Sequence, residues 1–127
     1  MACVLKVFPR IAFAAVLASA GPAFAGSMSA GAQAFQAQCS ICHRTAGKAQ
    51  AAVGPDLFGV VGRKAGSQQG YAYSAAMKHS GLIWTPDELK LYLANPQKVV
   101  PGNKMPFPGL HDSTRLDAVL SYLETLK

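Results

Sequence analysis

Cysteine and acidic residues are both scarce in this chain of 127 residues. Three cysteines are too few for a disulfide framework, and one of them, Cys3, lies near the N-terminus, apart from the other two. Six acidic residues against twelve basic ones leave a formal net charge of +6. The basic residues are scattered and form no arginine-rich tract, which argues against nucleic-acid binding. The charge favours docking to an acidic protein surface, with only peripheral contact with an anionic membrane.

A hydrophobic run long enough to span a bilayer is also lacking. Residues 11–20 are apolar but fall short of the ~20 residues that a spanning helix needs. Lys6 and Arg10 precede this run, and Ala23-Phe24-Ala25 follows it as a small-residue cleavage site. The pattern predicts a secretory signal peptide over residues 1–25 and an exported, periplasmic domain over residues 26–127. Cleavage after Ala25 lowers the net charge from +6 to +4; an uncleaved membrane anchor is the alternative.

The run that organises the rest of the chain is Cys39-Ser40-Ile41-Cys42-His43, a C-x-x-C-H motif. Its thiols are three positions apart, about one helical turn, so both can reach the edge of one flat ligand. The imidazole directly after them can reach the centre of that ligand. This is the attachment pattern of a c-type haem, in which the thiols form thioethers with the vinyl groups and His43 binds the iron. The motif therefore predicts one haem c, covalently attached through Cys39 and Cys42.

Other interpretations of the C-x-x-C pair find little support elsewhere in the chain. A thioredoxin-like redox pair belongs in a βαβ unit, whereas the residues around Cys39 favour a helix followed by a glycine-rich loop. A structural zinc site needs two more ligands, and the remaining histidines, His79 and His111, do not form a suitably spaced pair. A chance occurrence of the motif without a cofactor is the third alternative.

Outside the motif, the sequence favours short helices joined by irregular segments. Helices are expected where a capping residue precedes an apolar periodicity, over residues 29–38, 74–80, 85–94 and 112–126. The clearest start is Thr85-Pro86-Asp87-Glu88, which has the pattern of a capping box. Residues 44–70 are glycine-rich and show no sustained period, so a loop is expected there. The predicted fold is a small all-α domain wrapped around one haem, with its first and last helices crossing at Gly31.

The second axial ligand is expected from residues 101–109, a segment too rich in proline and glycine for a helix or a central strand. Met105 lies in this segment. Its thioether sulfur is a suitable iron ligand if the loop crosses the far face of the haem. Met77 and Met28 are the competing methionines.

Further pocket residues follow from what a haem requires. The carbonyl of Pro55, or a neighbouring carbonyl, can accept the hydrogen bond that a proximal histidine donates from its second ring nitrogen. Arg63 can compensate a buried propionate, and its alternative is an ordinary surface arginine. Aromatic side chains with polar tips can line the pocket and donate to the propionates, or simply belong to the core: Tyr71, Tyr73 and Trp84.

Together these motifs resemble those of the class I cytochromes c, close to the mitochondrial type and its bacterial periplasmic relatives. The resemblance covers about the whole of residues 26–127. Besides the C-x-x-C-H motif, it is carried by Gly31 and Phe35, Gly54-Pro55-Asp56-Leu57, Gly62-Arg63-Lys64, Gly70-Tyr71-Ala72-Tyr73, Gly81-Leu82-Ile83-Trp84, Tyr92-Leu93, Asn95-Pro96 and Pro101-Gly102-Asn103-Lys104-Met105.

The resemblance implies a soluble one-electron carrier that turns over no substrate. It makes His43 and Met105 the axial ligands of the iron, with Pro55 as the acceptor for His43. It also implies that Tyr73 and Trp84 hold a propionate, with Arg63 nearby. Tyr92 would contact the methionine sulfur, and Phe107 would cover the exposed haem edge.

Docking residues and partners are implied in the same way. Lys48, Lys98 and Lys104 would belong to a ring of docking lysines on a monomer. The expected partners are a membrane cytochrome bc complex and a terminal oxidase or photosynthetic reaction centre. Two departures from the family pattern are expected to alter the reduction potential, local stability or partner affinity: Met77 replaces a common asparagine, and Gln97 a common lysine.

The alternative functions are an electron-accepting subunit of a periplasmic dehydrogenase, and a haem peroxidase or gas sensor with an open iron site.

Overall fold

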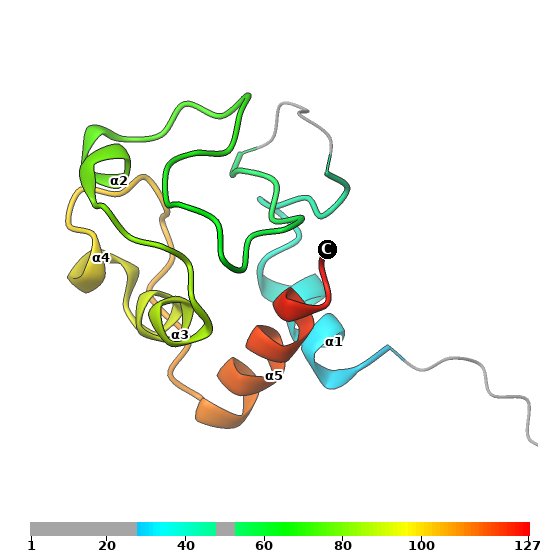
Figure 1. Ribbon diagram of the computed structural model, residues 1–127. Coiled ribbons are helices and arrows are strands. Elements are labelled where there is room, and N and C mark those ends of the chain that lie inside the picture. Colours follow the sequence, from blue (N-terminus) through cyan, green and yellow to red (C-terminus); the bar gives the residue numbers. More distant parts are fainter. Residues whose placement is uncertain (1–27, 48–52) are drawn as a thin grey trace, which may run out of the picture.

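The computed structural model describes residues 28–47 and 53–127. Its helices are α1 (Ala30–Gln38), α2 (Ala75–His79), α3 (Pro86–Ala94), α4 (Pro96–Val99) and α5 (Ser113–Glu124), with a long loop between α1 and α2 (Figure 1). The predicted all-α fold is confirmed, since the only β pairing among these residues is an isolated bridge between Lys64 and Ile83. No helix in the described ranges has the length and apolar character needed to cross a bilayer. The predicted signal peptide and Lys48 lie outside the described residues.

Helix starts follow the capping pattern that the sequence predicts. Each of the four predicted helices begins after a side-chain oxygen that accepts a backbone N–H three residues later, at 2.9–3.2 Å: Ser29, Ser74, Thr85 and Asp112. At α3 only half of the expected capping box forms. The backbone N–H of Thr85 donates to the carbonyl of Ile83 at 2.7 Å rather than to Glu88. In a complete capping box the glutamate side chain accepts the N–H of the capping residue. Here the carbonyl of Ile83 takes the place of the Glu88 side chain.

Helix α4 (Pro96–Val99) was not predicted from the sequence. Asn95 ends α3, as expected, but its Oδ1 also accepts the backbone N–H of Lys98 at 3.1 Å and so caps the next helix. Pro96 occupies the first position of α4, where its missing N–H costs nothing, and its side chain is fully buried. One asparagine and one proline thus turn the chain sharply from α3 into α4.

Gly31 permits the close crossing of α1 and α5, which lie side by side in Figure 1. A Cβ at Gly31 would lie 2.0 Å from the carbonyl oxygen of Ala118, so no side chain fits between the helices. Phe35, one turn later, packs its ring against Tyr122 with the ring centroids 5.1 Å apart. The predicted crossing at Gly31 is therefore present.

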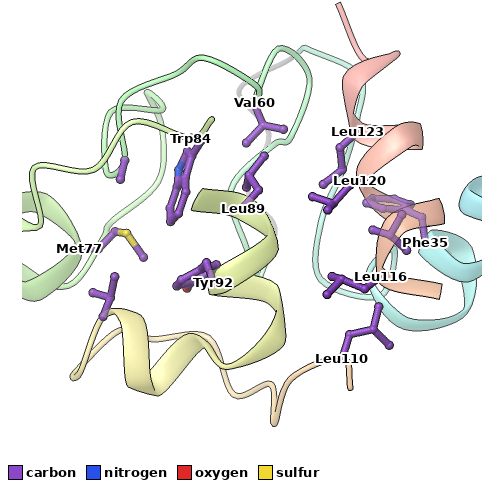
Figure 2. Close-up of a cluster of buried hydrophobic side chains, with 13 residues drawn as sticks. Phe35, Val60, Met77, Trp84, Leu89, Tyr92, Leu110, Leu116, Leu120 and Leu123 are labelled. Carbon is purple, nitrogen blue, oxygen red and sulfur yellow. The ribbon is translucent and has the colours of Figure 1, made fainter. Parts of the chain in front are cut away.

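Buried side chains from the helices and from the long loop share one core (Figure 2). Phe35 and the leucines of α5 form one side of the view, and Met77, Trp84 and Tyr92 form the other. Val60, from the long loop, lies in this core and is only 3% exposed. Hydrogen bonds from Gly62 N–H to the Trp84 carbonyl (2.8 Å) and from Ala65 N–H to the Leu82 carbonyl (2.9 Å) join the loop to the segment before α3. The part of the loop around Val60 and Ala65 therefore belongs to the folded interior.

Replacing Gly31 with alanine is expected to lower the free energy of unfolding by about 1–3 kcal/mol, because the added methyl group overpacks the helix crossing. Helix propensity alone predicts the opposite sign, since alanine is better than glycine in a helix interior by ~1 kcal/mol. Chemical denaturation of the wild type and the variant measures the difference. Ala37→Gly, on the exposed face of the same helix, is the control and is expected to cost ~1 kcal/mol. A stabilised Gly31→Ala protein would contradict a tight crossing.

Candidate functional site

One cavity of about 250 Å³ lies against both the helices and the long loop. Its walls are mainly apolar, with Phe35, Val60, Leu89 and Val119 among the lining side chains. All ten residues that the sequence predicted for cofactor binding line this cavity: Cys39, Cys42, His43, Pro55, Arg63, Tyr73, Trp84, Tyr92, Met105 and Phe107. Residues far apart in the sequence thus meet around one apolar space.

The end of α1 presents the cysteine motif to this cavity. Cys39 is the C-terminal cap of α1, and its carbonyl accepts the backbone N–H groups of Cys42 (3.1 Å) and His43 (2.9 Å). The turn therefore continues past the helix and holds both thiols and the imidazole at one wall of the cavity. Both thiols are half-buried and free of any disulfide. This arrangement fits a flat ligand joined to two thioethers.

The environment of the thiols disfavours redox or zinc chemistry. Burial, with a smaller contribution from Cys42, raises the pKa of the Cys39 thiol to about 11. A thioredoxin-like nucleophile requires the opposite shift, because the thiolate is the reactive form. No group of three or more His, Cys, Asp or Glu side chains that could hold a metal ion occurs among the described residues. Both alternative interpretations of the C-x-x-C pair thus lose support.

A hydrogen bond fixes the orientation of His43. Its Nδ1 lies 2.8 Å from the carbonyl oxygen of Pro55, as predicted. A carbonyl only accepts, so Nδ1 carries the proton and Nε2 keeps its lone pair. Gly54 leaves room for the ring, because a Cβ there would lie 2.6 Å from Cε1 of His43. Burial lowers the pKa of His43, and the bond to Pro55 opposes this shift more weakly. The imidazole is therefore neutral near pH 7, which is the form that binds metals.

Asp56 supports this wall, although sequence reasoning assigned it no role. Its buried carboxylate accepts the backbone N–H of Ala46 at 3.1 Å and that of Phe58 at 2.7 Å. The second bond forms an Asx-turn, for which an aspartate directly after Pro55 was the available signal. The first reaches across to the segment after His43 and depends on the tertiary structure. Asp56 therefore ties together the two segments that orient the imidazole.

Arg63 lies half-buried at the cavity and makes three hydrogen bonds. Its guanidinium donates to the carbonyls of Phe58 (3.0 Å) and Asp56 (2.9 Å) and to Oε1 of Gln68 (2.6 Å). Burial lowers its pKa, while Tyr73 and Asp56 oppose the shift, yet an arginine remains cationic at any ordinary pH. The interpretation as an ordinary surface arginine is therefore wrong, because these bonds hold a positive charge at the cavity wall.

The aromatic residues form two pairs at the cavity. The rings of Trp84 and Tyr92 lie 4.8 Å apart between centroids, and those of Tyr71 and Tyr73 also lie 4.8 Å apart, edge to face. Burial raises the pKa of Tyr92 to about 12 and also raises that of Tyr73. Both phenols are therefore protonated at neutral pH and are available as hydrogen-bond donors.

The structure separates the three candidate methionines. Met28 is 51% exposed and does not line the cavity, whereas Met77 and Met105 both do. Met77 is nearly fully buried beside Trp84 and Tyr92 (Figure 2). Met105 is half-buried on the segment after α4, and the neighbouring Lys104 donates through Nζ to the carbonyl of Ala72 at 2.8 Å. Two thioethers thus reach the cavity, one from the core and one from the loop.

Comparisons with known proteins identify the family. The Cytochrome c family model matches residues 28–127. The cytochrome c2 of Rhodopila globiformis is 50% identical over 93 residues, which are 73% of this chain and 87% of that protein. The cytochrome c2 of Rhodoblastus acidophilus is 46% identical over 103 residues, covering 81% of this chain and 95% of that protein. The solved structure of cytochrome cH from Methylobacterium extorquens has a TM-score of 0.70 and 48% identity, covering 76% of this chain and 95% of that one.

The helical fold and the C-x-x-C-H motif at an apolar cavity define a small protein with a covalently attached c-type haem. The chain belongs to the cytochrome c family. It is an electron carrier, and its single haem c is attached through Cys39 and Cys42. The free thiols, the oriented imidazole and the cationic Arg63 at the cavity all fit this group.

Replacing Met77 with asparagine is expected to lower the free energy of unfolding. The cost is about 1–3 kcal/mol, because an amide would enter a site that is now 7% exposed and surrounded by the apolar core. Denaturant titration of the purified holoprotein measures this difference. Met77→Leu, which keeps the volume and polarity, is the control and should cost less than ~1.5 kcal/mol. An equally stable asparagine variant would mean that polar groups near residue 77 accept the amide.

Proposed function

We propose that His43 and Met105 are the axial ligands of the iron, and that the protein carries single electrons between periplasmic or membrane-bound redox partners. The observation that supports this most strongly is the hydrogen bond from His43 to the carbonyl of Pro55, since it leaves Nε2 as the only ring nitrogen free to bind a metal. Met105 lines the same cavity and supplies a second donor of the kind that raises a haem potential.

When bound, the haem supplies the reversible one-electron change of its iron. The residues of the chain hold it in one environment through that change. His43 keeps its proton on Nδ1, and the Pro55 carbonyl strengthens the imidazole as a donor. The protonated phenols of Tyr73 and Tyr92 and the indole N–H of Trp84 offer neutral donors, and Arg63 offers a fixed positive charge. The apolar lining excludes water, so Phe107 and its neighbours limit access to the iron.

The location and the docking surface complete the proposal. Residues 1–25 act as a cleaved signal peptide, and residues 26–127 function in the periplasm. The net charge of +4 on that segment favours encounter with acidic faces of redox partners such as a cytochrome bc complex, a terminal oxidase or a photosynthetic reaction centre. Lys98 and Lys104, which precede and follow Pro101 in the sequence, are both exposed. We assign these two lysines to docking.

Replacing Met105 with alanine tests the ligand assignment. The ferric wild-type protein should show the weak far-red absorption band that marks sulfur-to-iron ligation, and the ferrous protein should not bind carbon monoxide. The variant should lose the band and bind carbon monoxide, because the sixth position of the iron opens. The samples are purified from the periplasmic fraction, where their intact mass should equal residues 26–127 plus one haem.

The matched control is Met77→Leu, which removes the other thioether that lines the cavity. It should keep the far-red band and remain closed to carbon monoxide. Loss of the band in Met77→Leu, together with its survival in Met105→Ala, would transfer the ligand role to Met77. A wild-type protein without the band would refute methionine ligation altogether.

Electron transfer to a partner with an acidic docking face is expected to slow as salt is added. The second-order rate constant should fall by about tenfold or more from low to high ionic strength, because screening weakens the attraction of the basic surface. Stopped-flow mixing with membranes that contain a cytochrome bc complex measures this rate. Lys98→Gln should make the dependence shallower, and reduction by a small uncharged reductant should not respond to salt. A rate that is flat across ionic strength would remove the steering role.

A further inference from the structure

Asn103 is a buried polar residue for which the roles described above give no use. It lies two positions before Met105 and is only 8% exposed. Its side-chain Nδ2 donates to the carbonyl of Val100 at 2.9 Å and to that of Pro96 at 3.0 Å. Its Oδ1 accepts the backbone N–H of Met105 at 2.8 Å. Two of these bonds tie the Asn103 side chain to α4 and its C-terminal cap, and the third ties it to the backbone of Met105.

The orientation of this amide is determined by its partners. Two of them are carbonyl oxygens, which only accept, and the third is a backbone N–H, which only donates. Exchanging Oδ1 and Nδ2 would set donor against donor and acceptor against acceptor on every bond. No aspartate or leucine makes the same three bonds, since the first lacks a donor when ionised and the second has neither group.

A second contact acts on the same segment from the outside. Nε2 of Gln97, on α4, lies 3.4 Å from the carbonyls of both Asn103 and Met105. The backbone N–H and the carbonyl of Met105 are thus both directed to side chains anchored at α4, while Phe107 N–H also donates to that carbonyl at 2.9 Å. The peptide groups on both sides of the Met105 Cα are held, which restricts where its sulfur can go.

We propose that Asn103 is a positioning residue that keeps the sulfur of Met105 on the iron by tying the Met105 backbone to α4. The inference rests on the proposed function, in which Met105 is an axial ligand. Any external ligand that takes its place must move this loop. The three hydrogen bonds of Asn103 add their free energy to the cost of that movement, so they protect the sixth position against competitors.

Competition by imidazole on the ferric holoprotein measures this cost directly. Imidazole displaces the methionine sulfur, and the loss of the far-red band gives its dissociation constant. Asn103→Leu removes all three bonds at similar volume, and the dissociation constant should fall by about tenfold or more, because the Met105 N–H loses its acceptor and the loop loses its ties to α4 when the sulfur is bound.

The matched control is Val100→Ala, at the end of α4. Val100 is 3% exposed, so the substitution destabilises the same region, but it leaves the Asn103 amide and its backbone partners in place. Its imidazole dissociation constant should change by about twofold at most. Denaturant unfolding of both variants gives their global stabilities. If both variants lower the dissociation constant alike, in proportion to lost stability, Asn103 is a structural residue only and the inference is wrong.

A second variant and a second measurement cover a failure of Asn103→Leu to fold. The hydroxyl of Asn103→Thr can accept the N–H two residues later but cannot donate to both carbonyls, so imidazole resistance should be partly restored. Hydrogen exchange at the backbone amide of Met105 in the wild-type protein needs no variant. That amide should be protected far beyond its exposed neighbours, and exchange at the rate of an open loop would overturn the inference.

Failure of the ligand role of Met105 and failure of the positioning role of Asn103 give different results. A wild-type protein without the far-red band would overturn the ligand role of Met105 and, with it, the role of Asn103. A wild-type protein with the band, whose imidazole affinity is the same in Asn103→Leu, would overturn the role of Asn103 alone.

Discussion

The hydrogen bond from His43 to the carbonyl of Pro55 is the contact on which the organisation of the cavity depends. It joins the turn after α1 to the long loop, and a backbone hydrogen bond from Gly54 N–H to the Cys42 carbonyl runs beside it at 2.9 Å. Through the carboxylate of Asp56 the same loop holds the segment after the histidine. The cysteines, the imidazole and the loop therefore form one wall, and the orientation of the imidazole follows from the fold of that wall.

The polar groups at the cavity share one electrostatic property. Burial keeps Tyr92 protonated, with a pKa of about 12, and it lowers the pKa of His43 so that the ring is neutral. Cys39 and Cys42 have no thiol proton to lose once they are thioethers. Arg63 stays positively charged, and its guanidinium donates hydrogen bonds to three acceptors. None of these groups changes its protonation state close to pH 7. The charge around the iron is then nearly constant, which suits a carrier that exchanges electrons without exchanging protons.

Local and compositional signals predicted most of the fold. The C-x-x-C-H motif, the capping residues and the apolar periodicities each act over a few residues, so the helix starts at Ser29 and Thr85 were predicted from sequence alone. The glycine of the helix crossing was predicted because a glycine on a favourable helix usually marks a close approach. Eight of the ten residues predicted at the cavity follow from the C-x-x-C-H motif and from what a haem requires. Tyr92 and Phe107 came only from the family resemblance, since periodicity does not indicate which side chains meet at a pocket.

What the sequence did not reveal depends on contacts between loops. The hydrogen bond between Asp56 and Ala46 and the hydrogen bonds of Asn103 to α4 join segments whose relative position is set only by folding. Helix α4 was missed because its four residues are too few to show a period, although Asn95 and Pro96 carry the cap and the first position. Arg63 was predicted at the cavity, but its acceptors were not, because they are two backbone carbonyls and a glutamine, none of which forms a charge pattern.

The crossing of α1 and α5 also bears on how the chain is made. The ribosome produces α1 first among the described helices and α5 last, so Phe35 has no Tyr122 to pack against until almost the whole domain has been synthesised. Nine residues are too short to remain helical alone in water. Helix α1 therefore cannot take its final place until α5 has been made, and the cysteines at its end stay accessible for the attachment of a cofactor while the chain is being synthesised.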